Sequence, residues 1–214
     1  MRFVRALGWA LLLLVACYLP AAVVVDALGI EPVVAIPVVL GISLIAAVGL
    51  MSPLVARSSF TLRELGLAPC SGSEALLALA AGTVVGLLAA ALGGQAGDLR
   101  LLELEKFPIW RTAVLFWLGA AIQEELLFRG LLQSVVARAL GSSAALPGAV
   151  PSAPAALVAL LFGALHLPAG LLGALVALLL GILAGELRAH AGSVIPAIIA
   201  HAACNCAATL GGLL

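Results

Sequence analysis

Long apolar runs separated by short polar stretches dominate the chain and predict a series of hydrophobic helices. Each run is long enough, or nearly so, to cross a bilayer as an α-helix. Pro37 and Pro53 interrupt the second run, and Pro168 ends the short fifth one. Seven segments emerge, at residues 7–28, 32–56, 74–94, 112–140, 155–167, 170–188 and 193 to the C-terminus. The pattern predicts an all-α, polytopic integral membrane helical bundle of about seven transmembrane helices, within a range of six to eight.

The polar stretches between these segments predict loops and interfacial elements. Residues 57–73 predict a loop with a short interfacial helix, and Ser73 is expected to cap the helix that follows. Charged residues interspersed with leucines at 97–111 predict an amphipathic segment at the membrane interface. Residues 141–154 are rich in Gly, Ser, Ala and Pro and predict a loop.

Composition supports a membrane protein and excludes some functions. The 214 residues are 64% hydrophobic and 9% charged, whereas soluble domains are roughly 45–50% apolar and about 25% charged. Because ten basic and ten acidic residues balance, no basic field attracts nucleic acid. The high apolar and low charged fractions indicate a lipid bilayer as the surroundings of the chain. The four cysteines form no C-x-x-C pair and are interpreted as small hydrophobic residues without a disulfide framework.

The first apolar segment follows Arg2 and Arg5, which raises a signal peptide as an alternative. The apolar run continues past Tyr18 to Val25, longer than a typical signal segment, so a retained helix is expected. Basic residues recur on alternate sides of the predicted helices, which favours a cytoplasmic N-terminus. The charged stretch before the fourth helix weakens that assignment. We expect one membrane domain over residues 1–214.

The sequence Q-E-E-L-L-F-R-G, residues 123–130, places three charges inside the fourth apolar segment. An ionisable side chain at the centre of a membrane helix costs about 2.5–3.5 kcal/mol on insertion scales. Glu125 and Arg129 are four residues apart, so they share a helix face and are expected to form an ion pair. Glu124 then has no partner. The alternative is that all three residues form a purely structural ion network.

Two later segments add polar residues at helical spacing. Phe162 and His166 share one face of the fifth segment, and His201 and Asn205 share one face of the seventh. Because lipid supplies no hydrogen-bond partners, these side chains and the glutamates are expected to meet in one polar intramembrane cavity. The third histidine, His190, is interpreted as a solvated surface residue in a loop.

These residue types suit hydrolysis of an amide bond. A carboxylate beside a histidine can hold a water molecule and take its proton, and a second His with an Asn can stabilise an oxyanion. The same groups offer an alternative, a divalent metal held by Glu124, His166 and His201. H-E-x-x-H is absent from the sequence. A nucleophilic role for Cys204 or another cysteine is disfavoured.

The motifs resemble those of the CPBP family of intramembrane proteases, which includes the CAAX prenyl endopeptidases. The resemblance rests on E-E-x-x-x-R at residues 124–129, F-x-x-x-H at 162–166 and H-x-x-x-N at 201–205, within a core region of residues 112–210. The resemblance implies the following roles: Glu124 as general base, His166 holding the attacking water, His201 and Asn205 as the oxyanion site, and Glu125, Arg129 and Phe162 as supporting residues.

Members of the family have been described as metalloproteases and as glutamic-type proteases without metal. We expect the metal-free mechanism and no cofactor, with zinc as the alternative. The implied substrate is a peptide or protein with a membrane-proximal or C-terminal tail, as in the myxosortase-like branch, and no nucleic acid is involved. We expect a multi-pass protein of a prokaryotic inner membrane. The rival functions are a non-catalytic immunity or scaffold protein and, less favoured, a transporter that uses the glutamates as a proton relay.

Overall fold

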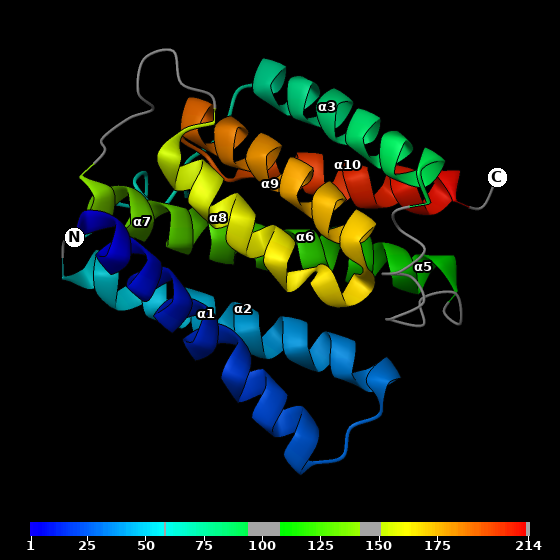
Figure 1. The fold of residues 1–214 in the computed structure, drawn as a ribbon, viewed down its shortest axis with the longest axis horizontal. Helices are drawn as coiled ribbons and strands as arrows, with labels where there is room; N and C mark the ends of the chain where they lie inside the picture. Colours follow the sequence, from blue (N-terminus) through cyan, green and yellow to red (C-terminus); the bar gives the residue numbers. More distant parts are fainter. Residues whose placement is uncertain (58, 94–107, 142–150, 213–214) are drawn as a thin grey trace.

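The computed structural model describes residues 1–57, 59–93, 108–141 and 151–212, and in these ranges every regular element is a helix. Figure 1 shows the helices lying roughly side by side along one long axis. The elements are α1 (Arg2–Ala27), α2 (Pro32–Ala56), α3 (Gly72–Ala91), α5 (Ile109–Thr112), η2 (Ala113–Ala120), α6 (Ala121–Glu125), η3 (Leu126–Leu132), α7 (Gln133–Leu140), α8 (Ala153–Leu165), η4 (Leu167–Ala169), α9 (Leu171–Ala191) and α10 (Ile195–Gly211).

The elements from α5 to α7 follow one another without a break, so we refer to residues 109–140 as helix four. Counted in this way, the described chain forms the seven helices that the apolar pattern predicts. Among them α1, α2 from Val34, α3 and α9 are long and apolar enough to cross a membrane, while α8 and α10 are shorter apolar helices. The protein is a multi-pass helical membrane bundle.

Some predicted boundaries are wrong. The second helix is not interrupted, because α2 runs through both Pro37 and Pro53; membrane helices tolerate proline when neighbouring groups satisfy the freed carbonyls. Ser71, not Ser73, caps α3: its hydroxyl accepts from the Glu74 backbone N–H, and the Glu74 carboxylate accepts from the Ser71 N–H. His190 is exposed as expected, but it belongs to the last turn of α9 rather than to a loop.

Two predicted segments fall largely outside the described residues. Of the amphipathic segment 97–111, only residues 108–111 are described, and the last three belong to α5. Of the loop 141–154, residues 142–150 are outside the description. Gly141 has a left-handed backbone with φ of 70° and ends α7, and α8 begins directly after Ser152.

The core of the bundle lies where α1 and α2 pack against helix four and α8. Ala6, Ala10 and Cys17 of α1 are fully buried in this core. Helix four contributes Leu127, Leu131 and other buried apolar residues to the same cluster. α1 thus supplies part of the core, and its retention in the mature protein stays a prediction.

α3 crosses α10 closely because glycines remove the side chains at the contact. A Cβ atom at Gly82 would lie 2.1 Å from the Ala200 carbonyl oxygen, and one at Gly86 would lie 2.4 Å from the Cys204 carbonyl oxygen. Small residues four apart allow membrane helices to approach in this way. The contact holds the part of α10 that carries His201 and Asn205.

Replacing Gly86 by Ala is therefore expected to lower the free energy of unfolding by about 1–3 kcal/mol, because the backbone of α10 must move away. The matched control is Gly49→Ala in α2, where an added Cβ meets nothing within 4 Å. Thermal unfolding in detergent measures both variants. Equal melting temperatures for Gly86→Ala and Gly49→Ala would contradict the close α3–α10 contact.

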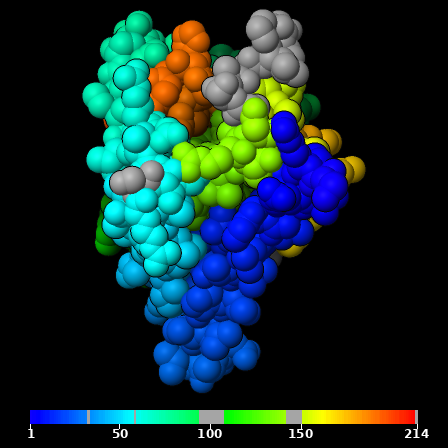
Figure 2. All heavy atoms as spheres, turned by 90° about the vertical axis from the view of Figure 1, so that its left-hand side faces the viewer, coloured from blue at the N-terminus to red at the C-terminus, as the bar shows by residue number. Residues whose placement is uncertain are grey.

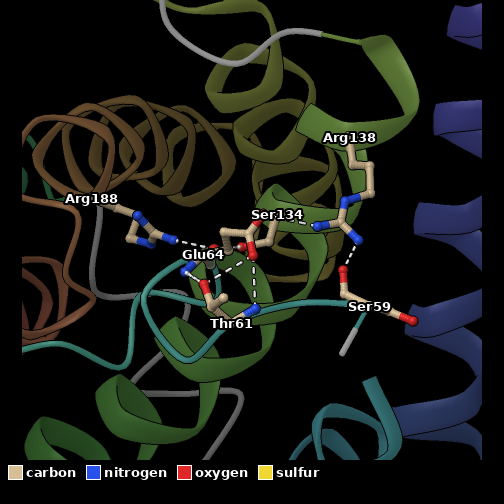
Figure 3. Close-up of polar contacts among 6 residues, drawn as sticks. All are labelled: Ser59, Thr61, Glu64, Ser134, Arg138 and Arg188. Atoms are coloured by element: carbon tan, nitrogen blue, oxygen red, sulfur yellow. Dashed lines mark hydrogen bonds and ion pairs between the residues drawn. The ribbon is translucent and has the colours of Figure 1, made fainter. Parts of the chain in front are cut away.

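The connection between α2 and α3 contains a turn where the sequence predicted a short interfacial helix. Hydrogen bonds from α7, from α9 and from the residue before α10 hold this turn in place. Its turn spans residues 62–66 and ends at Gly66, whose φ is +76°. Ser134 of α7 and Arg188 of α9 both donate to the Glu64 carbonyl oxygen, each at 2.7 Å. The Val194 N–H, just before α10, donates to the Gly66 carbonyl at 2.9 Å. Figure 3 shows the Glu64 contacts.

The Glu64 carboxylate holds the same turn together. Thr61 donates to it from its backbone N–H at 2.7 Å and from its hydroxyl at 2.9 Å, and Arg138 donates at 2.9 Å. These hydrogen bonds, led by the one from the Thr61 backbone, lower the pKa of the Glu64 carboxyl from its ordinary value. A carboxyl whose pKa is lower in the folded than in the unfolded protein stabilises the fold at pH values above its unfolded pKa of about 4.3. This stabilisation is lost as the pH falls through the folded-state pKa.

Glu64→Gln is therefore expected to lower the melting temperature at pH 7 and to lower it less as the pH falls below about 4. The reason is that acid protonates the Glu64 carboxyl of the wild-type protein and removes the stabilisation by its charge. Glutamine has no such charge at any pH. Thermal unfolding of both proteins across this pH range gives the difference. A difference that stayed constant down to pH 3 would show that the charge of Glu64 does not stabilise the fold.

Candidate active site

Helix four carries the paired glutamates on a short α-helical stretch between two π-helical ones. α6 holds Glu124 and Glu125, while η2 precedes it and η3 follows it. In a π-helix the backbone hydrogen bond reaches one residue further than in an α-helix, and such stretches often occur at functional sites. The periodicity predicted a continuous α-helix here, so the π-helical stretches are a finding of the structure.

The predicted ion pair between Glu125 and Arg129 is confirmed. Arg129 Nη1 lies 2.9 Å from Glu125 Oε1, and both side chains are 0% exposed. Arg129 Nη2 also donates to the Gly181 carbonyl oxygen of α9 at 3.1 Å. The guanidinium carbon lies 4.7 Å from the centre of the Phe162 ring, within range of a cation–π contact. The pair thereby ties helix four to α8 and α9.

Glu125 has a second partner that the sequence analysis did not predict. His201 Nδ1 lies 2.8 Å from Glu125 Oε1, the same oxygen that Arg129 contacts. A carboxylate can only accept, so Nδ1 carries the proton of this hydrogen bond. The other ring nitrogen, Nε2, then faces Glu124, whose Oε2 is 3.9 Å away. Glu125 fixes the orientation of His201, and His201 presents Nε2 to Glu124.

Glu124, His166, His201 and Asn205 line one cavity of about 430 Å³. These four side chains line one cavity, as predicted, whereas Glu125 and Arg129 were also expected there and are buried outside it. The catalytic roles of the four stay predictions. The Glu124 side chain is 19% exposed, in contrast to the fully buried Glu125. Most of the cavity wall is apolar, and it is built from α1, α2, helix four, α8, η4, α9 and α10.

His166 is held by the end of the helix that carries it. α8 ends at Leu165, and His166 Nδ1 lies 2.8 Å from the Phe162 carbonyl oxygen. That carbonyl belongs to the last turn of α8, where the helix offers no further N–H partner. The His166 and Phe162 rings are in contact, with centroids 4.6 Å apart. With Nδ1 engaged in this way, Nε2 is the nitrogen available to a molecule in the cavity.

Asn205 joins α10 to helix four at the cavity wall. Its Nδ2 donates to the Phe116 carbonyl oxygen of η2 at 3.2 Å. One turn further along α10, Thr209 accepts from Trp117 Nε1 at 3.3 Å. The Asn205 amide has two hydrogens, and the bond to Phe116 uses one of them. The predicted oxyanion role of Asn205 therefore depends on the second hydrogen.

Sequence reasoning missed two polar residues of the cavity, Tyr18 and Gln123. Both line it, Tyr18 from α1 and Gln123 from α6. Gln123 is 1% exposed. A signal existed for each: Tyr18 is the only tyrosine of the chain and lies within an apolar segment, and Gln123 directly precedes the glutamate pair.

The metal alternative depends on how many side-chain donors meet at one point. In the ranges that the structure describes, no group of three His, Cys, Asp or Glu side chains is placed to hold a metal ion. Glu124 Oε2 and His201 Nε2 lie 3.9 Å apart, a separation that two ligands of one ion can have. The hydrogen bond from His201 Nδ1 to Glu125 is the contact that a ligating histidine usually makes with its other ring nitrogen. The described side chains thus offer two ligand atoms but no group of three, and the metal alternative stays a prediction.

Fold and site together define a polytopic helical membrane protein with a carboxylate–histidine cavity inside the bundle. Residues 106–207 match the family model described as Type II CAAX prenyl endopeptidase Rce1-like. This part of the chain is similar to that family, which agrees with the resemblance to the CPBP intramembrane proteases. The match includes all three motifs. No curated protein and no solved structure matches the chain.

Proposed function

We propose that the protein is an intramembrane endopeptidase that hydrolyses a peptide bond with a water molecule activated by Glu124. The observation that carries the proposal is the arrangement of one partly exposed carboxylate and two histidines around a cavity in a chain that is similar to a protease family. Glu125 and Arg129 satisfy each other's charge. Glu124 is left as the carboxylate that faces the cavity and can take a proton.

In the proposed mechanism a water molecule binds between Glu124 and the free Nε2 of His166. Glu124 takes a proton from the water as the oxygen attacks the carbonyl carbon of the substrate. The negative charge that develops on the carbonyl oxygen is stabilised by hydrogen bonds from His201 and Asn205. Glu124 then returns the proton to the leaving amine, which completes the hydrolysis and restores the carboxylate.

For His201 to donate through Nε2 while Nδ1 donates to Glu125, the imidazole must carry both protons. The charges around it suit this state. Glu124 and Glu125 contribute two negative charges and Arg129 one positive charge, so a protonated His201 makes the cluster neutral. A neutral cluster is the arrangement that a membrane interior tolerates best.

The substrate in this proposal is a polypeptide with an apolar, membrane-proximal or C-terminal segment, because the wall of the cavity is mostly apolar. We further propose a location in the inner membrane of a prokaryote, no requirement for a metal and no role for nucleic acid. The test is incubation of the purified protein in liposomes with peptides that carry such a segment, with products identified by mass spectrometry. One new terminus within or beside the apolar segment is the expected result.

The same assay with a chelator separates the two chemical versions of the proposal. Full cleavage after metal stripping is expected, whereas loss of cleavage that added zinc restores would establish the metalloprotease. If the folded protein cleaves no peptide and Glu124→Ala and His166→Ala both keep the cellular phenotype, the non-catalytic immunity or scaffold function replaces the protease.

A further inference from the structure

The charged residues are distributed unequally between the two ends of the bundle. We call the end at which α1 begins and α2, α7 and α9 end the basic end; Figure 2 looks onto it, with α1 in blue, α2 in cyan, α7 in green and α9 in orange. The basic end has six arginines: Arg2, Arg5, Arg57, Arg63, Arg138 and Arg188. Three glutamates lie at the same end: Glu64, Glu74 and Glu186.

The opposite end has the reverse balance. Its described charged residues are Asp26, Glu31 and Arg111. Among the described residues, six arginines lie at the basic end and one lies at the opposite end. Basic residues close to membrane helices remain on the cytoplasmic side. The basic end is therefore the cytoplasmic one.

The cavity occupies the half of the bundle away from the basic end. In α2 its lining residues are Ala35, Ile36, Val39 and Leu40, near the start of that helix at the opposite end. Helix four lines it from Leu115 to Glu124, and Glu124 lies near the middle of this helix. The turn η4, which joins α8 to α9 at that end, contributes Pro168 and Ala169.

Buried residues close the cavity toward the basic end. Beyond Glu124 in that direction lie the Glu125–Arg129 pair, with both side chains 0% exposed, and the fully buried Leu131. Gln133 then donates to the Gly185 carbonyl oxygen at 3.0 Å and ties helix four to α9. These residues leave the opposite end as the route into the cavity.

The arrangement of helices agrees with a mouth at the opposite end. Figure 1 shows the α1–α2 hairpin diverging from α8 and α9 towards that end, while the start of α1 lies close to α7 at the basic end. The cavity lies between the two groups of helices, because Tyr18 of α1 and Ala35 of α2 line one side and His166 and Gly173 line the other.

We propose that the cavity opens to the extracytoplasmic side of the membrane and takes a membrane-anchored or exported polypeptide whose scissile bond lies in the outer half of the bilayer. The identity of the substrate rests on the proposed protease function, whereas the orientation rests on charge and cavity position alone. A chain whose cleavage site remains in the cytoplasm, such as a cytoplasmic C-terminal tail, does not reach Glu124 in this orientation.

The orientation is tested by labelling single cysteines in intact bacterial cells with a membrane-impermeant maleimide. Cys17, Cys70, Cys204 and Cys206 are first replaced, since all four are free thiols. Three reporters follow in this background: Leu28→Cys at the opposite end, Leu62→Cys at the basic end and Ala169→Cys at the cavity. Leu28 and Leu62 are 70% and 54% exposed.

Labelling of the reporters at 28 and 169 in intact cells, and of the reporter at 62 only after permeabilisation, is the expected result. The reverse pattern would overturn the proposed orientation. Labelling at 28 without labelling at 169 in folded protein would show that the cavity does not open to that side, and would also overturn it. Labelling requires no turnover, so a correctly oriented protein without activity would leave the orientation intact and remove the protease function.

The substrate class is tested in proteoliposomes in which the protein has either of its two orientations. The cysteine at residue 62 reacts from outside only where the basic end faces outward, and this reaction separates the two populations. An anchored peptide added from outside is expected to be cleaved by the population whose basic end faces the lumen and not by the other population. Cleavage only by the population with the basic end outward would overturn the proposed substrate class. Cleavage by both populations at equal rates would overturn it as well.

Discussion

Glu124→Gln is expected to lower kcat for peptide cleavage by about 10²–10⁴-fold, the usual contribution of a general base. Glutamine has nearly the same size but takes no proton from water. The free energy of unfolding is expected to change little, because Glu124 is partly exposed to the cavity and Arg129 contacts Glu125 instead. Initial rates in liposomes, with thermal unfolding in parallel, measure both effects.

The control for this substitution is Glu31→Gln, which removes an exposed carboxylate at the start of α2, outside the cavity. It is expected to cleave at the wild-type rate. If Glu124→Gln also cleaved at that rate, Glu124 would have no part in the chemistry. A loss of kcat accompanied by an equally large loss of stability would indicate a structural role.

Arg129→Met is expected to destabilise the protein by about 3–5 kcal/mol, because it leaves the Glu125 carboxylate buried without its charge partner. Methionine keeps the length and apolar contacts of the arginine stem, so the effect isolates the lost charge and its hydrogen bonds. Among the residues that the structure describes, Glu125 then keeps His201 alone as a hydrogen-bond partner. Thermal or denaturant unfolding in detergent measures the loss.

The double variant Glu125→Gln/Arg129→Met tests whether the unpaired charge is the cause. It is expected to be more stable than Arg129→Met alone, because no buried charge remains unpaired. Arg57→Met, at the exposed end of α2, serves as the surface control and should change stability by about 0.5 kcal/mol or less. If the double variant were no more stable than the single one, packing rather than charge would explain the loss.

The sequence alone predicted those features that depend on local spacing. The apolar runs predicted the seven helices, since a bilayer requires spans of a certain length. The four-residue spacing of Glu125 and Arg129 predicted their ion pair, because i and i+4 side chains meet on a helix. The need to satisfy polar groups in lipid predicted that His166, His201 and Asn205 would line one cavity with Glu124.

Features that depend on packing between distant segments could not be predicted in this way. His201 contacts Glu125 from 76 residues away in the sequence, and Tyr18 reaches the cavity from a helix near the N-terminus. A short interfacial helix was predicted within residues 57–73, but the structure has a turn at residues 62–66, which Ser134 and Arg188 fix from other helices. Spacing along one segment carries no information about such partners.

The most direct test of the central claim compares cleavage by Glu124→Gln, His166→Ala and the double variant in the same liposomes. If both residues act on one water molecule, each single variant should lose most of the activity and the double variant should lose little more, since groups that act as a unit are non-additive. Losses that multiplied in the double variant, or wild-type cleavage by either single variant, would contradict a site in which Glu124 and His166 act together.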